Sequence, residues 1–204
     1  MGETDRSLIW IPIIHTQVDQ GSMSDTVREL YVRKLGEKKW DQHVRAVESK
    51  WRRITETIQD LELDYAHVRL YQDGLPVSGH EAAIVRDLAH AGSRNHSLLL
   101  ELMDKGASLT GTESPELLVE EYELAQQVLV SLEGRKVGAA ARGYHERSKR
   151  LLERRDRFIA GRIHDTLQPG ETGLLFLGLL HSLDGRLPRD VRLRRIDSVL
   201  RDES

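Results

Sequence analysis

The sequence predicts a three-layer α/β domain, in which a mainly parallel sheet of about four to five strands is flanked by long helices. The first observation is the apolar run Leu174 to Leu177, which is too short for a helix and is followed by Gly178, as in a fully buried strand. The second is that such runs alternate with helical segments, and strands joined by helical crossovers are parallel. The third is the length of 204 residues, which fits one domain spanning 1–204.

Composition and charge narrow the function classes. The net charge is −3, with 30 basic and 33 acidic residues, so no overall field favours nucleic acid or an anionic membrane. The absence of cysteine excludes disulfides and thiolate metal ligands, and leaves His, Asp and Glu for a metal or for acid and base chemistry. The sequence has no basic N-terminal region before an apolar stretch and no membrane-spanning run. We therefore expect a cytoplasmic protein that contacts no membrane.

The first element is an apolar run over residues 7–14, directly followed by His15. This pattern predicts a buried strand. Pro12 predicts that the strand lies at a sheet edge or is irregular, because proline lacks the N–H that hydrogen-bonds to a neighbouring strand. Helical patterning then begins near Ser24 and continues to Leu61, with a break expected at Gly36.

The second half of this helical segment carries a heptad seam. Its apolar residues alternate spacings of four and three, as helices that pack on a partner helix do: Trp40, Val44, Val47, Trp51, Ile54, Ile58 and Leu61. Two partners fit this pattern. The first is the later helix around Val137 to Leu152, and the second is the same helix of another subunit, which would make the protein a homo-oligomer.

The remaining elements follow from turn residues and periodicity. Residues 66–71 alternate as a strand and end at Asp73 in a Gln-Asp-Gly turn. The last strand should form a sheet edge with Arg192 and Arg194 pointing outward. Capping residues, glycines and apolar spacing predict the others: helices from Gly79 to Gly92, Ser93 to Lys105 and Pro115 to Gly134, a long helix ending near Leu167, and strands at 107–109 and 191–196.

Four side chains that carry chemistry follow predicted strands: His15, Asp73, Glu113 and His181. Ligands and catalytic groups gather at the carboxyl ends of parallel strands, so we expect these four at one edge of the sheet. We predict that His15, His181 and Asp73 bind a divalent metal ion and that Glu113 acts as the catalytic base.

Arg155 lies on the apolar stripe of the long helix, four residues after Leu151 and three before Phe158. An unpaired buried charge is costly, so its guanidinium must either reach water along the helix margin or find an acceptor. The nearest predicted acceptors are Asp73 and Glu113. The first alternative makes Arg155 a surface residue, and the second places it in the site.

Two short motifs resemble the TraB and TIKI group of the erythromycin esterase and ChaN-like superfamily. That group has an Arg-Asn pair on a helix and two Gly-x-x-His motifs after strands; here the pair is Arg155-Asp156, and Gly178-x-x-His181 matches the second motif. The first motif departs from the pattern, because proline replaces glycine in Pro12-Ile-Ile-His15. The resemblance covers the last third of the chain and the first strand. It implies a metal-dependent hydrolase, with Arg155 and Asp156 at the substrate.

Two function classes remain open at this stage. One is a metal-assisted hydrolase acting on a small-molecule or peptide substrate, in which Arg155 holds an anionic group or the oxyanion formed on attack. The other is a non-catalytic module that senses a small anion or binds a protein and dimerises through its long helices.

Overall fold

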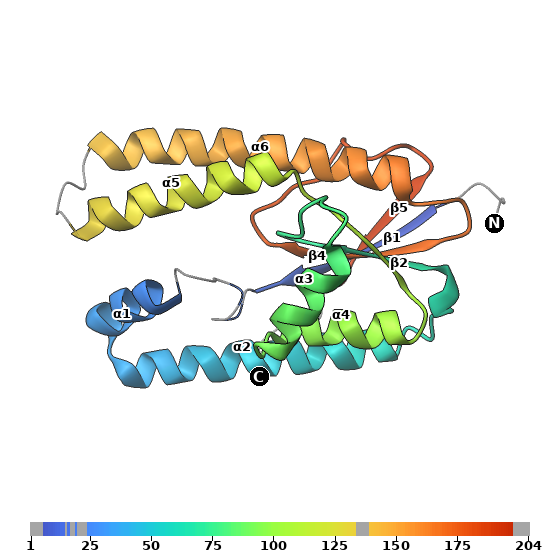
Figure 1. Ribbon diagram of the computed structural model, residues 1–204, viewed down its shortest axis with the longest axis horizontal. Helices are drawn as coiled ribbons and strands as arrows, with labels where there is room; N and C mark the ends of the chain where they lie inside the picture. Colours follow the sequence, from blue (N-terminus) through green and yellow to red (C-terminus); the bar gives the residue numbers. More distant parts are fainter. Residues whose placement is uncertain (1–5, 15, 17–18, 20–23, 134–138, 198–204) are drawn as a thin grey trace.

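A computed structural model describes residues 6–14, 16, 19, 24–133 and 139–197, and it shows the predicted three-layer α/β fold (Figure 1). The sheet has five strands in the order β3-β2-β4-β1-β5. Every strand pair in the described part of the chain is parallel. The strands are β1 (Arg6–Ile13), β2 (Val68–Gln72), β3 (Ser108–Thr110), β4 (Thr172–Gly178) and β5 (Val191–Arg195).

Six helices cover the two faces of this sheet (Figure 1). The break expected at Gly36 separates the first two of them. On one face, called here the α2/α4 face, α2, α3 and α4 pack on the strands and α1 packs on α2. On the other, the α6 face, α6 packs on the strands and α5 packs on α6. The helices are α1 (Ser24–Leu35), α2 (Glu37–Gln59), α3 (Glu81–His90), α4 (Arg94–Asp104), α5 (Pro115–Glu133) and α6 (Ala139–Thr166). In the described residues, no helix is both long and apolar enough to span a bilayer.

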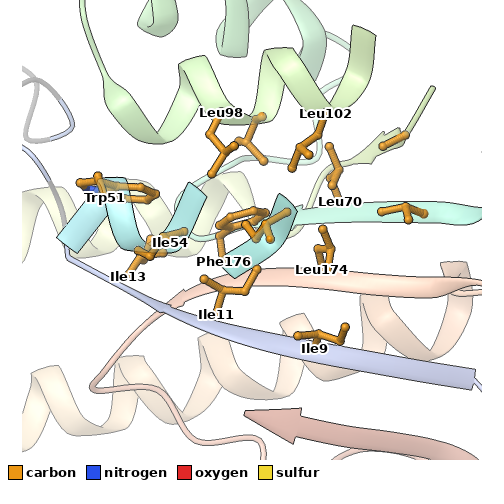
Figure 2. Packing of buried hydrophobic residues seen from close by; sticks show 14 of the residues in the cluster. Ile9, Ile11, Ile13, Trp51, Ile54, Leu70, Leu98, Leu102, Leu174 and Phe176 are labelled. Atoms are coloured by element: carbon orange, nitrogen blue, oxygen red, sulfur yellow. The ribbon is translucent and has the colours of Figure 1, made fainter. Parts of the chain in front are cut away.

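Two apolar cores form because neighbouring residues of a strand point to opposite faces. Ile9 and Ile11 of β1 join the core of the α2/α4 face, whereas Leu8 and Trp10 join the core of the α6 face. Figure 2 shows the first core, with side chains from three strands meeting those of α2 and α4. The strands are therefore apolar on both sides, which explains why they read as continuous apolar runs.

The edge position predicted for β1 from Pro12 is wrong, because β1 lies between β4 and β5. The Trp10 carbonyl accepts a hydrogen bond from the Ile196 N–H at 2.9 Å, so Trp10 faces β5, and alternation turns Pro12 to the same side. Pairing with β5 ends at Trp10 and Arg195, whereas Pro12 pairs only with Leu177 of β4. Proline is tolerated here because its missing N–H faces a point that β5 no longer reaches. β5, the neighbour of β1, is itself an edge strand with Arg192 and Arg194 exposed, as predicted.

The partner predicted for the heptad seam is also wrong. All of the seam except Leu61 lies on one continuous helix, α2, which ends at Gln59. Its central residues are buried, but they pack on the sheet and on α4. The Trp51 indole donates to the carbonyl of Ile14 at 3.1 Å, and Ile54 and Ile58 join the same core. Val137, where the predicted partner helix begins, lies outside the described residues; from Ala139 to Leu152 that helix is part of α6, on the opposite face. Because the chain's own sheet and α4 cover the seam from Val47 onward, those residues offer no surface for a second subunit, and the predicted homo-oligomer has no support from them.

Candidate functional site

Three of the four predicted side chains come together at the carboxyl edge of the sheet. Asp73 follows β2 directly, Glu113 follows β3, and His181 ends a short turn after β4. One ligand atom from each lies within 4.8 Å of the others. The backbone fixes this arrangement, because the Asp73 N–H donates to the Phe176 carbonyl at 2.8 Å. A parallel sheet thus gathers residues that are far apart in the chain, as predicted.

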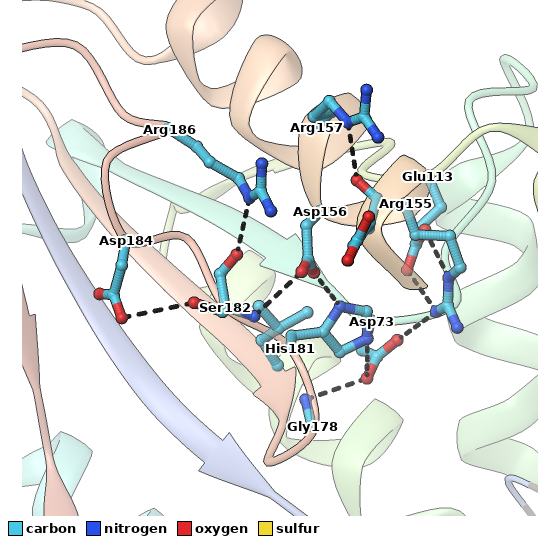
Figure 3. A network of polar contacts seen from close by, with 12 residues as sticks. Asp73, Glu113, Arg155, Asp156, Arg157, Gly178, His181, Ser182, Asp184 and Arg186 are labelled. Atoms are coloured by element: carbon cyan, nitrogen blue, oxygen red, sulfur yellow. Dashed lines mark hydrogen bonds and ion pairs between the residues drawn. The ribbon is translucent and has the colours of Figure 1, made fainter. Parts of the chain in front are cut away.

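Arg155 of α6 binds both carboxylates of this group (Figure 3). Its Nη2 donates to Asp73 Oδ1 at 2.8 Å and to Glu113 Oε1 at 2.6 Å, and its Nε donates to Glu113 Oε2 at 3.1 Å. Arg155 is 4% exposed. The alternative of a surface arginine is therefore wrong, and the predicted acceptors are the observed ones.

Burial and pairing set the electrostatics of this ion pair. Glu113 is fully buried. Burial raises the pKa of Glu113, and the hydrogen bonds from Arg155 offset that rise only in part. Burial alone would lower the pKa of Arg155, but its hydrogen bonds to Glu113 raise it above the ordinary value. Arg155 is therefore permanently charged, while Glu113 is a carboxyl group that accepts a proton more readily than one in water.

His181 is oriented by the carboxylate of Asp156, the residue that follows Arg155 on α6 (Figure 3). Its Nδ1 lies 2.7 Å from Asp156 Oδ1, and the other Asp156 oxygen accepts the Ser182 N–H at 3.1 Å. Its Nε2 then faces Asp73 Oδ2 at 3.6 Å. Burial would lower the pKa of His181, but the hydrogen bonds to Asp156 and Asp73 prevail and raise it to about 9.

Gly178 holds the second oxygen of Asp73. Its N–H donates to Asp73 Oδ2 at 3.0 Å, and a Cβ atom added at this position would lie 2.9 Å from the same oxygen. That distance is shorter than real Cβ contacts. A glycine is therefore required for the backbone to approach the carboxylate this closely.

The other predicted site residues stand as follows. His15 lies outside the described residues, so its place in a shared metal site stays a prediction. Asp156 is in the site, but both of its oxygens are engaged by His181 and Ser182. This favours a role in positioning His181 over the predicted contact with substrate.

Two features of the site escaped sequence analysis. Glu121 of α5 is half-exposed and accepts a hydrogen bond from Arg155 Nη1. It lies four residues after the buried Leu117, and this helical spacing is the signal that places it on the face turned to α6. The pairing of Asp156 with His181 has a weaker signal: Asp156 precedes Ile159 and Ala160 by three and four residues, on the buried face.

A second buried polar cluster lies at the start of α4. The Ser93 hydroxyl contacts Asp19 Oδ1 at 2.5 Å and His96 Nδ1 at 2.7 Å, while Thr16 donates to the other Asp19 oxygen. Burial would raise the pKa of Asp19, but the interactions with His96, Ser93 and Thr16 lower it to about 2. The cluster attaches the segment after β1 to α4.

Comparisons with models of known families, with curated proteins and with solved structures give no match for this chain. The resemblance to the TraB and TIKI group stays a prediction.

Proposed function

We propose that this protein is a hydrolase that uses a divalent metal ion bound by Asp73, Glu113 and His181. The observation that carries the proposal is that these three buried residues present ligand atoms within 4.8 Å of one another at the carboxyl edge of a parallel sheet. Oxygen and imidazole nitrogen ligands suit several divalent ions, including zinc and manganese.

The orientation of His181 supports a metal site. Metal-binding histidines usually present one ring nitrogen to the ion while the other is held by a carboxylate or a carbonyl. Asp156 holds Nδ1 in this way and leaves Nε2 directed at Asp73. The same pairing serves a catalytic histidine, so His181 is preorganised for either role.

The charges of the site also favour a cation. Three buried carboxylates, those of Asp73, Glu113 and Asp156, face one guanidinium and one imidazole. Arg155 already occupies three of the four oxygens of Asp73 and Glu113. Each carboxylate oxygen can accept a second partner. An ion would therefore share these oxygens with Arg155 and bind less tightly than at carboxylates without an arginine.

Each residue then has a distinct task. A divalent ion would supply Lewis-acid chemistry and a nucleophilic water near neutral pH. Glu113 would be a ligand of this ion, held in place by Arg155, rather than the base expected from the sequence. Among the carboxylates that contact Arg155, Glu121 is half-exposed, so a substrate can replace it at the guanidinium without entering the core. An anionic oxygen of the substrate or transition state would take that place.

The anion-sensor alternative has less support. A pocket for a small anion needs an excess of positive charge, whereas the three carboxylates of Asp73, Glu113 and Glu121 outnumber the guanidinium of Arg155 unless a metal ion is bound. The dimer that this alternative assumed would have used the α2 seam, which is buried inside the chain.

Calorimetric titration of chelator-stripped protein with Zn²⁺ and Mn²⁺ tests the metal site. We expect one ion per chain, loss of binding in Asp73→Asn, and a decrease of about 10- to 100-fold in affinity in Asp156→Asn. Glu120→Gln is the matched control, because Glu120 pairs with Arg154 at the surface, and its affinity should equal that of the wild type. Thermal melts of each variant show whether it is folded.

Hydrolysis needs its own measurement. Stripped and metal-reloaded protein should be screened against ester, peptide and phosphoester libraries. Activity that returns with the metal and is lost in Asp73→Asn supports the proposal. Wild-type protein that binds neither ion would overturn it.

A further inference from the structure

The turn that carries His181 also carries two exposed leucines. Leu179 is 45% exposed and Leu180 is 84% exposed, which makes Leu180 the most exposed large apolar side chain in the described part of the chain. The His181 N–H bonds the Gly178 carbonyl at 3.3 Å, so the two leucines occupy the middle of a tight turn. Such positions favour Gly, Asn, Asp, Ser or Pro. Formation of the turn therefore does not account for leucine at these two positions.

These leucines lie beside one of the two places where the site meets solvent. His181 and Asp73 are each 7% exposed, whereas Glu113 is fully buried. The other place is at Arg155, whose partner Glu121 is half-exposed. A substrate that reaches the site at the His181 and Asp73 end meets the turn that carries the leucines. Because consecutive Cα atoms are about 3.8 Å apart, the side chain of Leu180 is anchored within one residue of the imidazole.

We propose that Leu179 and Leu180 form an apolar rim that selects substrates carrying an apolar group next to the scissile bond. The inference rests on the proposed hydrolase function and names its substrate class. A single exposed leucine needs no explanation on a protein surface. Here two exposed leucines follow each other in a tight turn, beside the proposed metal ligand. Their apolar area leaves water only when an apolar group of another molecule covers it.

Alkyl hydroxamic acids test the rim without requiring turnover. They bind metal ions through the hydroxamate group and present an alkyl chain at the position of the substrate's apolar group. Binding of acetohydroxamate and hexanohydroxamate to the Zn²⁺-loaded protein is measured by calorimetry. Full burial of one methylene strengthens binding about fourfold and half-burial about twofold, so four added methylenes should strengthen binding roughly tenfold or more.

The variants separate the rim from the metal site. In Leu179→Ser/Leu180→Ser, the preference for hexanohydroxamate should fall below about twofold, while Zn²⁺ affinity in the absence of hydroxamate is measured separately. Leu35→Ser is the matched control, because Leu35 is an exposed leucine at the end of α1, and it should keep the full preference.

The outcomes distinguish the two proposals. If the wild type binds Zn²⁺ and both hydroxamates with equal affinity, the rim is overturned and the metal site stands. If the double variant keeps the tenfold preference, the apolar contact lies elsewhere and the assignment to Leu179 and Leu180 is wrong. If the wild type binds no Zn²⁺, the proposed function fails and the rim fails with it.

Discussion

Replacing Arg155 with alanine should destabilise the protein by about 3–5 kcal/mol at neutral pH. Arg155 makes three hydrogen bonds to Asp73 and Glu113, and both oxygens of the fully buried Glu113 depend on it. Without the guanidinium, Glu113 keeps only a long hydrogen bond of 3.4 Å from the Gly74 N–H. Two carboxylates would then face each other in the interior, with His181, 3.6 Å from Asp73, as the remaining counter-charge.

The neighbouring arginine provides the matched control. Arg154 pairs with Glu120 at 2.6 Å, a distance as short as those made by Arg155, but both side chains are about half exposed. Arg154→Ala should therefore cost less than about 1 kcal/mol. For a chain of this size, the Arg155→Ala cost corresponds to a melting temperature lower by roughly 6–20 °C. Urea unfolding followed by circular dichroism measures both variants.

The loss of stability in Arg155→Ala should depend on pH. The pKa of Glu113 is already raised above 4.5 by burial, and loss of the arginine raises it further. A carboxyl group with a raised folded-state pKa costs no stability below its unfolded pKa, and the cost grows as pH rises toward the folded value. The deficit should therefore be smaller at pH 5 than at pH 8. Equal stability of the Arg154 and Arg155 variants at pH 8 would refute the reasoning.

Three further predictions concern the histidine and two glycines. The pKa of His181 is raised from 6.5 to about 9, so the protonated imidazole stabilises the metal-free protein fully below pH 6.5. This stabilisation, about 3 kcal/mol in total, is lost as pH rises through 9. In urea titrations, His181→Gln should abolish this part of the pH dependence of stability. Gly178→Ala should lower Zn²⁺ affinity roughly tenfold by displacing the Asp73 carboxylate, and unchanged affinity would contradict the close approach. Gly161→Ala, in a helical position with open space around it, should raise stability by about 0.5–1 kcal/mol in the same unfolding assay, and a loss would show an unrecognised contact.

The sequence predicted the elements well because their signals are local. Caps, glycines and apolar spacing lie within each helix or strand, and the carboxyl end of a parallel strand is known once the strand is known. That is why Asp73, Glu113 and His181 could be placed at one edge before their contacts were known.

The errors concern properties that depend on distant parts of the chain. Pro12 is tolerated because β5 ends at Arg195, which no local pattern around Pro12 reveals. The α2 seam has the same spacing whether a helix or a sheet covers it, so its periodicity could not identify the partner. The contact of Asp156 with His181 requires the rotation of α6 relative to the end of β4, which is a result of tertiary packing.

The position of β1 between β4 and β5 has a consequence for how the chain folds during synthesis. The apolar run Leu8 to Ile13 is made first, but its neighbours in the sheet are made last, from Thr172 onward. Helices α2 and α4 can cover one face of that run earlier, yet its backbone N–H and C=O groups have no ladder until β4 leaves the ribosome. Contacts so distant in sequence form slowly, and they leave an exposed strand edge meanwhile. Insertion of β4 beside β1 also delivers His181 to Asp73, so the candidate site is completed only when the sheet closes.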